Sequence, residues 1–379
     1  MASKEILFHG FSGINNSVKQ TKIGISENAV AGLSSANNVF IGVGGTLETV
    51  PEEVISLSGS FHSLWGLKDK FYCVKDETAS AVLYCGNVLN GALSMRTVAV
   101  GLSKGSMVSY TKLGEDIYYS NGIDKGYIDD NDVRFDWPIQ HNSRLLDLVT
   151  FTPGSHIDVL AGRMLSINGD EIRFSESFLP GLYDDVKNRR RLNSAGQMVC
   201  SVGSGAYVSD EDYVYFLTEV DPNKWKLKKV LDYPAIAYGQ YPNLVDPSFF
   251  GFQTRQPSLL FNTQEGVCIG MPSGEVYNLT HKRYHSTTAY EALTIFDESL
   301  VILSNADKGI LVQGMREDVG NKPTTEWDGG FNSLFTNTQN EVICANELGL
   351  FFLWGQDDPQ LTGLEMLSDL EMLSTLEMI

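Results

Sequence analysis

A unit of short apolar strands joined by polar turns recurs along this sequence with a period in the forties. Its clearest copy spans residues 110–129, where an alternating strand meets the turn Gly114-Glu115, a second strand follows, and residues 121–126 reverse the chain again. Further copies occupy residues 251–268, 292–313 and 333–353, and weaker ones residues 64–84, 159–183 and 206–228. Asn and Gly recur in these reversals because both tolerate left-handed backbone, so we assign them a structural role.

Seven apolar positions mark the equivalent point of the seven copies. They are Phe71, Ile117, Ile172, Val214, Leu259, Val301 and Val342. The spacings between them are 46, 55, 42, 45, 42 and 41 residues. Repeats of about 40 to 50 residues made of strands are typical of propeller blades, whereas a β-solenoid needs a shorter period. The sequence therefore predicts an all-β fold, a seven-bladed β-propeller.

The predicted propeller occupies residues 1–358, and its seven repeats fill residues 64–355. Residues 1–63 precede the first repeat and contain strand candidates at 38–42 and 46–50. A ring of blades must close on itself, so we expect part of this N-terminal segment to complete the last sheet as a clasp.

Two further segments are predicted to be loops. Residues 133–157 and 231–250 contain five prolines and few alternating runs, which indicates long loops on one face. The basic run at residues 187–191, KNRRR, is more typical of a solvated loop than of a docking patch for an acidic neighbour.

The charge balance limits the classes of partner. A formal net charge of −19 argues against direct nucleic-acid binding, because phosphate contacts need a basic face, and it disfavours an anionic membrane for the same reason. The first residues carry no signal-peptide pattern, and no apolar run reaches 18 residues, so we expect neither secretion by a signal peptide nor membrane insertion.

The five cysteines form no CxxC pair and lie mostly within apolar strand patterns. An odd count without metal-ligand spacing predicts reduced core thiols rather than disulfides or a zinc site, which suits folding in a cytoplasm.

The sequence carries no recognisable catalytic or metal-binding motif, so we expect no catalytic residue, no metal, no cofactor and no enzymatic activity. His281 and His285 have the spacing of a helical metal pair but lie between strand repeats, where that spacing does not bring them together. Residues 129–132, DDND, lack the Gly and distal Glu of a calcium loop and are predicted to form an acidic turn.

The last residues differ in kind from the rest. Residues 359–379 are predicted to be a separate tail that contains the six-residue repeat LEMLSD-LEMLST-LEMI. An aliphatic residue every third position drifts around a helix, so such a segment buries little by folding alone and needs a partner surface. We expect docking to another subunit, with packing on its own propeller as the alternative. The docking residues are Leu364, Leu367, Leu370, Leu373, Leu376 and Ile379.

Several segments together resemble β-propeller structural proteins of tailed bacteriophages: FHGFSGINN, NNVFIGVGGTLETVPE, GEDIYYSNGIDKGYID and AGRMLSINGDEIRFSESFLPGLYD. Proteins of that family often open with Gly-Ile-Asn-Asn, here residues 13–16, and then carry an Asn-Val strand that runs into Gly-x-Leu, here Asn38-Val39 and residues 45–47. Where the family closes that strand with Arg-Pro-Gly, this chain has Val50-Pro51-Glu52. The resemblance covers residues 5–185 in patches.

The resemblance implies a non-catalytic part of a phage virion, in the tail, baseplate or neck, assembled in the host cytoplasm. Its partners would be other virion proteins, in a symmetric ring or complex. The alternative is a carbohydrate-binding or glycan-cleaving, sialidase-like propeller. That alternative is motivated by aromatic loop residues near Trp137, Tyr183 and Tyr241, and by the partial similarity of residues 124–126 and 307–309 to an Asp-box.

Overall fold

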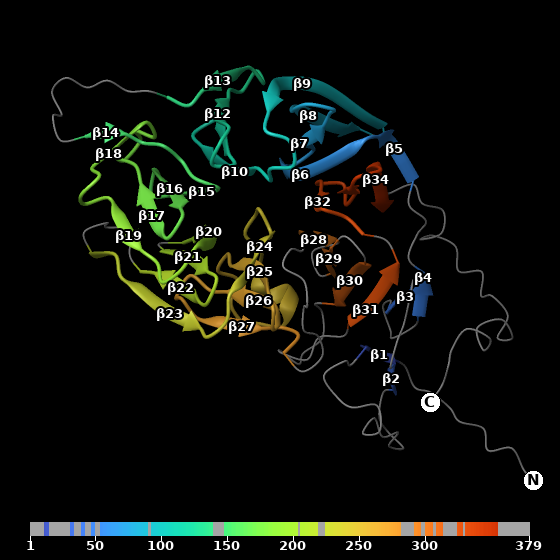
Figure 1. Cartoon of the computed structure of the whole chain (residues 1–379). Coiled ribbons are helices and arrows are strands. Elements are labelled where there is room, and N and C mark those ends of the chain that lie inside the picture. Colours follow the sequence, from blue (N-terminus) through green and yellow to red (C-terminus); the bar gives the residue numbers. More distant parts are fainter. Residues whose placement is uncertain are drawn as a thin grey trace, which may run out of the picture.

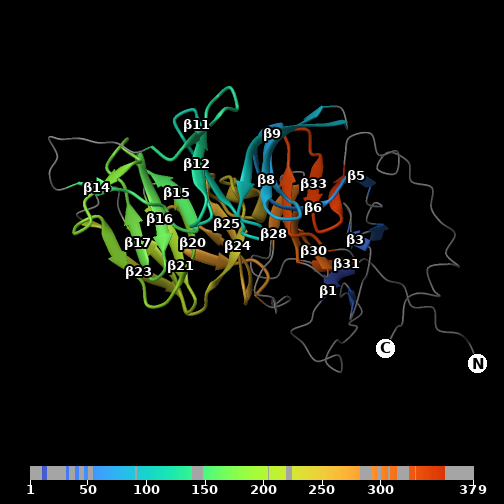
Figure 2. The same ribbon diagram turned by 45° about the horizontal axis from the view of Figure 1, so that its top comes forward.

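The computed structural model shows a ring of β-sheets arranged around a central axis (Figures 1 and 2). It describes residues 11–14, 31–33, 39–41, 47–49, 54–89, 92–138, 148–203, 205–218, 224–281, 292–296, 300–305, 308–313, 324–328 and 330–354. Within these residues, seven four-stranded antiparallel sheets form the blades of a propeller. The predicted all-β, seven-bladed fold is therefore confirmed.

The first four blades follow one another along the chain, and each begins with the strand nearest the axis. Blade 1 contains β6 (Ser60–Leu67), β7 (Lys70–Asp76), β8 (Ala81–Leu89) and β9 (Ala92–Leu102); blade 2 contains β10 (Ser109–Leu113), β11 (Asp116–Ser120), β12 (Lys125–Ile128) and β13 (Arg134–Asp136). Blade 3 contains β15 (His156–Leu160), β16 (Arg163–Asn168), β17 (Glu171–Phe174) and β19 (Arg189–Arg191); blade 4 contains β20 (Gly196–Val202), β21 (Gly205–Asp210), β22 (Val214–Leu217) and β23 (Leu227–Leu231).

The remaining blades complete the ring. Blade 5 contains β24 (Ala235–Gln240), β25 (Leu259–Thr263), β26 (Gly266–Gly270) and β27 (Val276–Asn278), with the 3-10 helix η3 (Pro247–Phe250) between β24 and β25. Blade 6 contains β28 (Ala292–Phe296), β29 (Leu300–Ser304), β30 (Lys308–Gln313) and β31 (Thr324–Asp328). Blade 7 contains β32 (Ser333–Thr336), β33 (Val342–Ala345), β34 (Gly349–Trp354) and β5 (Val54–Ser58).

The fourth strand of blade 7 comes from the N-terminal segment, so the predicted clasp exists. Strand β5 pairs antiparallel with β34, where Leu57 faces Leu350, and the Gly59 N–H donates to the Leu348 carbonyl over 3.0 Å. The clasp is not formed by either strand candidate at 38–42 or 46–50. Those residues instead pair with each other as β3 (Val39–Ile41) and β4 (Leu47–Thr49), in a separate two-stranded sheet.

Two other small sheets lie outside the blades. Strands β1 (Phe11–Ile14) and β2 (Ala31–Leu33) pair in parallel, and both β1 and β3 contact β31, the outermost strand of blade 6. Strand β14 (Val149–Thr150) lies in the connection between blades 2 and 3, and β18 (Leu182–Tyr183) lies between the third and fourth strands of blade 3. The two strands pair antiparallel.

The equivalence of the seven marker residues was wrong in two blades. Phe71, Ile117, Leu259, Val301 and Val342 lie in second strands, but Ile172 and Val214 lie in the third strands β17 and β22. Asn168 ends β16 and Gly169 begins the turn to β17, and this Asn-Gly pair is the stronger turn signal in the sequence. The first hairpin of blade 3 instead turns at Ala161 and Gly162, both of which have positive φ. The pattern therefore placed the repeat one hairpin too late.

The core is divided among the seven contacts between adjacent blades. Alternation along each strand explains this arrangement, because successive side chains point to opposite faces of a sheet. In β29, Val301 and Leu303 pack against blade 5, while Ile302 between them packs against blade 7. In β25, Leu259 and Phe261 face blade 4 in the same way. All five cysteines are free and buried within these contacts, as predicted.

Asn side chains hold the turns as the repeat suggested. The Asn121 side-chain oxygen accepts the N–H groups of Ile123 and Asp124 over 2.9 and 2.6 Å, and Asn346 accepts those of Leu348 and Gly349 in blade 7. These bonds satisfy turn backbone groups that no strand partner reaches.

Three loop predictions were wrong. Residues 133–157 contain β13, the outer strand of blade 2, together with β14 and the start of β15. Residues 231–250 include strand β24, the innermost strand of blade 5, because Pro234 and Pro242 flank the strand without interrupting it. Within the basic run, Arg189–Arg191 forms β19, the outer strand of blade 3, where Arg191 pairs with Asp170 over 3.0 Å and Arg189 with Glu171 over 3.6 Å.

Candidate functional site

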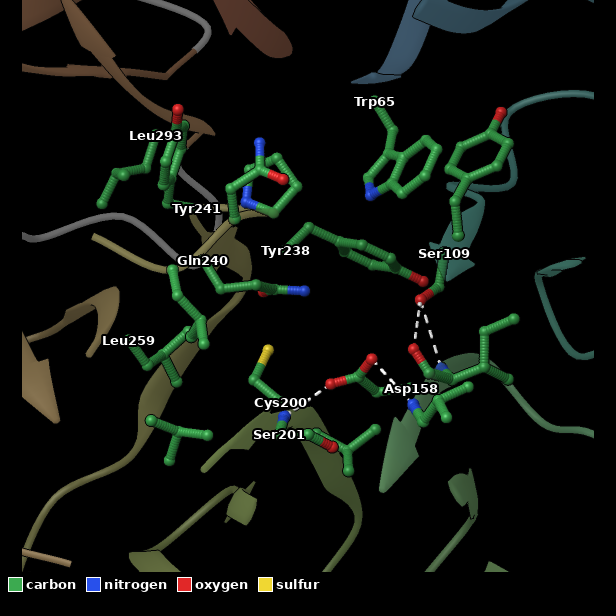
Figure 3. Close-up of a pocket in the computed structure, with 18 of the residues that line it drawn as sticks. Trp65, Ser109, Asp158, Cys200, Ser201, Tyr238, Gln240, Tyr241, Leu259 and Leu293 are labelled. Carbon is green, nitrogen blue, oxygen red and sulfur yellow. Dashed lines mark hydrogen bonds between the residues drawn. The ribbon is translucent and has the colours of Figure 1, made fainter. Parts of the chain in front are cut away.

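A cavity of about 370 Å³ lies on the propeller axis and is lined by the first strands of all seven blades or the residues beside them (Figure 3). The first strands of blades 3, 4 and 5, which are β15, β20 and β24, end on the same side of the ring. Ala161, Gly203 and Leu244 lie in the connections that follow these strands, and all three line the cavity. We call this side of the ring the exit face. In an antiparallel blade, the connections from third to fourth strand lie on the same face.

Tyr238 crosses the axis and joins blades that are not neighbours. Ala235 of β24 pairs with Thr263 of β25, and Gln240 pairs with Phe261. Between these two pairs β24 advances by five residues and β25 by only two, so the extra residues of β24 bulge toward the axis. The backbone of Tyr238 has φ of 58°. Its hydroxyl donates to the Met107 carbonyl beside blade 2 over 3.3 Å. Its ring stacks on His156 of blade 3, with centroids 4.4 Å apart.

Asp158 in β15 is the acidic group of the cavity wall, and it links blades 2, 3 and 4. Its Oδ1 accepts the Thr111 hydroxyl over 2.9 Å and the Val159 N–H over 2.8 Å, and its Oδ2 accepts the Ser201 N–H over 2.5 Å. Burial raises the pKa of the Asp158 carboxyl, and these hydrogen bonds offset part of the rise. Figure 3 shows Asp158, Tyr238 and Gln240 directed toward the middle of the cavity.

Aromatic rings form much of the remaining wall. Trp65 of blade 1 stacks on Tyr110 of blade 2, with centroids 5.7 Å apart and planes at 21°. Tyr241 lines the cavity from blade 5 and also packs against the core between blades 5 and 6. The cavity is thus bounded by planar faces with a few polar groups, the usual composition of a small-molecule site.

Buried polar atoms on this wall lack a hydrogen-bond partner within the described part of the chain. They are the hydroxyl oxygens of Tyr110, Ser201 and Ser333 and the side-chain oxygen Oε1 of Gln240. Buried polar groups are normally satisfied, so such atoms on one cavity wall indicate room for a ligand or ordered water.

The described lining residues contain one carboxylate, Asp158, and neither Lys nor Arg. Burial raises the pKa of the Cys200 thiol well above its usual range, so this lining thiol stays protonated and is a poor nucleophile. The arrangement is therefore suited to holding a ligand.

Four exposed large apolar side chains lie in the connections of the exit face, whereas Ile123 and Leu348 lie in connections on the opposite face. Phe178 and Val186, each 74% exposed, lie between the third and fourth strands of blade 3, Val133 lies at the corresponding place in blade 2, and Leu244 lies in blade 5. The Phe178 N–H donates to the Gly162 carbonyl over 2.7 Å, and its ring covers Gly162, next to the cavity residue Ala161.

Of the residues singled out from the sequence, the structure brings few together. Leu364, Leu367, Leu370, Leu373, Leu376 and Ile379 of the tail, and His285, lie outside the described residues. His281 is exposed in a turn, and the described residues contain no group of three or more His, Cys, Asp or Glu side chains able to hold a metal ion. Nor does any helix within them have the length and apolar character to cross a membrane.

Two of the three aromatic residues considered for sugar stacking are occupied elsewhere. Trp137 is buried between blades 2 and 3 and donates its indole N–H to the Pro180 carbonyl over 3.1 Å. Tyr183 packs edge-on against Phe151 in the same contact. Tyr241 alone of the three lines the axial cavity.

The predicted acidic turn at residues 129–132 proves to be an inter-blade contact. Asp132 accepts the Tyr72 hydroxyl of blade 1 over 3.0 Å, and it forms ion pairs with Lys70 and Arg96 of the same blade. The cluster is therefore structural.

Comparison with solved structures identifies the architecture. Streptogramin B lyase superposes with a TM-score of 0.50 at 15% identity, over 79% of this chain and 96% of that chain. The extracellular domain of a putative one-component system of B. thetaiotaomicron gives 0.50 at 9% identity, over 84% and 40%. The chain is a β-propeller. The WD40 propeller domain of Doa1 gives 0.48 at 8% identity, over 82% and 96%. No protein-family model and no curated protein matches the sequence.

Sequence reasoning missed Trp65, Asp158, Tyr238 and Gln240, the main side chains of the cavity wall. They come from three blades, and none lies in a spacing motif. The run AIAYGQ at residues 235–240, alternating before Tyr241-Pro242, is the one local signal that could have revealed the inner strand of blade 5.

Proposed function

We propose that this propeller is a non-catalytic protein-interaction module that docks onto other virion proteins of a tailed phage, in the tail, baseplate or neck. The resemblance of its N-terminal half to phage propeller proteins supports the virion context. The fold supports the mode of action, because a closed ring of blades presents its connecting loops on a rigid scaffold.

Phe178 is the observation that carries the docking proposal. It is a large apolar residue, 74% exposed, and its φ of 57° lies in the left-handed region that bulky residues rarely adopt. Such a backbone costs of order 1–3 kcal/mol and persists where surrounding structure enforces it, most often at functional sites. Here the Gly162 carbonyl and the bare Gly162 backbone hold the ring out over the exit face.

The tail is proposed as the second docking element. Burying each of Leu364, Leu367, Leu370, Leu373, Leu376 and Ile379 is worth about 1.5–3 kcal/mol. Ordering the backbone costs roughly 1–2 kcal/mol per residue, so a partner groove must bury most of them to give a net gain.

The test combines the purified chain with each product of the neighbouring virion genes. We expect a stoichiometric complex by analytical ultracentrifugation, and we expect deletion of residues 360–379 to abolish it while the Tm of the propeller stays almost unchanged. A chain that remains monomeric with every such product would refute the proposal. A truncated chain that unfolds several degrees earlier and still assembles would show that the tail belongs to its own propeller.

The carbohydrate-binding alternative keeps one supporting observation, the aromatic wall of the axial cavity. A glycan array and a fluorogenic glycosidase assay test it directly, and signal in either would favour it over the docking proposal.

A further inference from the structure

We propose that the axial cavity binds an organic cation, a guanidinium or ammonium group, which reaches it as a free small amine or as an Arg or Lys side chain of a docked protein. The second source rests on the proposed function, and the first does not.

The charge of the wall selects a cation over other ligands. Asp158 is the one carboxylate among the described lining residues, which include neither Lys nor Arg. An anionic ligand such as an acidic sugar would find no partner for its charge on this wall, and it would face Asp158. The net charge of −19 extends the same preference beyond the cavity, because an acidic surface raises the local concentration of cations.

The hydrogen-bonding capacity of the wall points the same way. A carboxylate offers about four acceptor positions. Two bonds use Oδ1 of Asp158 and one uses Oδ2, so Oδ2 retains acceptor capacity. Gln240 contributes a further buried acceptor, Oε1, without a partner in the described chain. Guanidinium and ammonium groups carry donors and no acceptor, so they match this set.

The aromatic walls complete the match. Trp65 and Tyr238 line the cavity together with Asp158, as Figure 3 shows. Aromatic faces attract organic cations through their quadrupoles, most strongly at Trp and where water is excluded. A volume of about 370 Å³ lies within the range of small-ligand sites, so a side chain of Arg or Lys is of suitable size.

The route into the cavity is consistent with a side chain delivered by a docked protein. Leu244 lines the cavity and is exposed on the exit face, and Ala161 lines it next to Gly162, the residue that Phe178 covers. A protein seated on Phe178 and Leu244 would therefore lie over the end of the axis at which the cavity begins.

Isothermal titration calorimetry with N-acetyl-arginine methylamide tests the site itself. The matched probe is N-acetyl-citrulline methylamide, which has nearly the same shape and no charge. We expect the arginine probe to bind at least tenfold more tightly, and we expect Asp158→Asn to weaken it at least tenfold. Because that variant loses the acceptor for the Ser201 N–H, Gln240→Met serves as a second variant, with an expected weakening of severalfold.

Equal affinity for the two probes, binding of methyl glucoside in their place, or binding of no probe would each overturn the cation site. The source of the cation is then read from the docked complex. If Asp158→Asn weakens that complex as much as it weakens the arginine probe, the partner supplies the side chain; if the complex is unaffected, the ligand is a free amine. Phe178→Asp should abolish docking and leave probe binding intact, which separates failure of the docking proposal from failure of the cation site.

Discussion

The ring of Tyr238 in blade 5 stacks on the ring of His156 in blade 3, with their centroids 4.4 Å apart and their planes at 28°. Blade 4 lies between blades 3 and 5 in the ring, so this contact joins two blades that are not neighbours. It exists because β24 bulges toward the axis and places Tyr238 in left-handed backbone. His156 is buried and Tyr238 is partly buried at the point where the axial cavity meets blades 2 and 3.

The first prediction follows from His156. Burial lowers the pKa of its imidazole from 6.5 to about 4. Between pH 6.5 and 4 the imidazole of residue 156 is therefore protonated in the unfolded chain and neutral in the folded chain. The free energy of unfolding consequently falls as the pH drops from 6.5 to 4. The expected loss from this one residue is roughly 3 kcal/mol.

The measurement is the free energy of unfolding against pH for the native chain and for His156→Phe, which cannot take up the proton. The variant should show a shallower decline between pH 6.5 and 4. Asp158 is common to both proteins, and its raised pKa acts in the opposite sense near the acid end, so the difference between the curves isolates His156. Parallel curves would contradict the assignment.

A second prediction concerns the division of the core between blades. Ile302 is completely buried between blades 6 and 7. Ile302→Ala should lower the free energy of unfolding by about 2–5 kcal/mol, because it removes apolar contacts and leaves a cavity. Val100 is 73% exposed on β9, so Val100→Ala should change it by less than about 0.5 kcal/mol. Urea unfolding measures both free energies. If the two variants lost similar amounts of free energy of unfolding, Ile302 would not be in the inter-blade core.

A third prediction concerns Gly154, at the contact of blades 2 and 3. A Cβ there would lie 1.7 Å from the Ile167 carbonyl oxygen, and the Gly154 carbonyl accepts the Ser120 hydroxyl over 2.7 Å. Gly154→Ala must therefore displace backbone, and it should cost at least about 2 kcal/mol. Gly169 has φ of 60° but open space around it, so Gly169→Ala should cost only about 1 kcal/mol, which chemical denaturation can resolve. The reverse order would contradict the close approach.

A fourth prediction tests the clasp. Deleting residues 1–58 removes β5 and exposes the edge of β34 in blade 7. Since each lost hydrogen bond is worth about 1 kcal/mol, the deletion should cost roughly 2–5 kcal/mol. Deleting residues 1–50 keeps β5, and the difference between the two deletions in calorimetry measures the clasp alone. Equal Tm values would mean that β5 does not stabilise the closed ring.

The repeat made the fold predictable because it depends on local signals. Asn121 and Asn346 mark turns by their own chemistry, and alternation such as that of Val301, Ile302 and Leu303 marks a strand with two buried faces. The register failed in blade 3, where the turn signal at Asn168-Gly169 is stronger than that at Ala161-Gly162.

The cavity could not be predicted from such signals, because its members meet only when the ring is closed. Trp65, Asp158 and Tyr238 are separated by 93 and 80 residues, and each is unremarkable within its own strand. The bulge that directs Tyr238 across the axis arises from pairing with β25, a relationship between strands that the residues of β24 do not encode locally.

Docking through the exit face is the central claim, and a matched pair of exposed apolar residues tests it. Phe178 and Val100 are 74% and 73% exposed, the first on the exit face and the second on the outer strand of blade 1. The measurement is the Kd of the complex with the binding partner identified among the products of the neighbouring genes, for Phe178→Asp and Val100→Asp. Phe178→Asp should raise the Kd at least a hundredfold with the Tm preserved, while Val100→Asp should leave the Kd within about twofold. Equal Kd values for the two variants would contradict docking at this face.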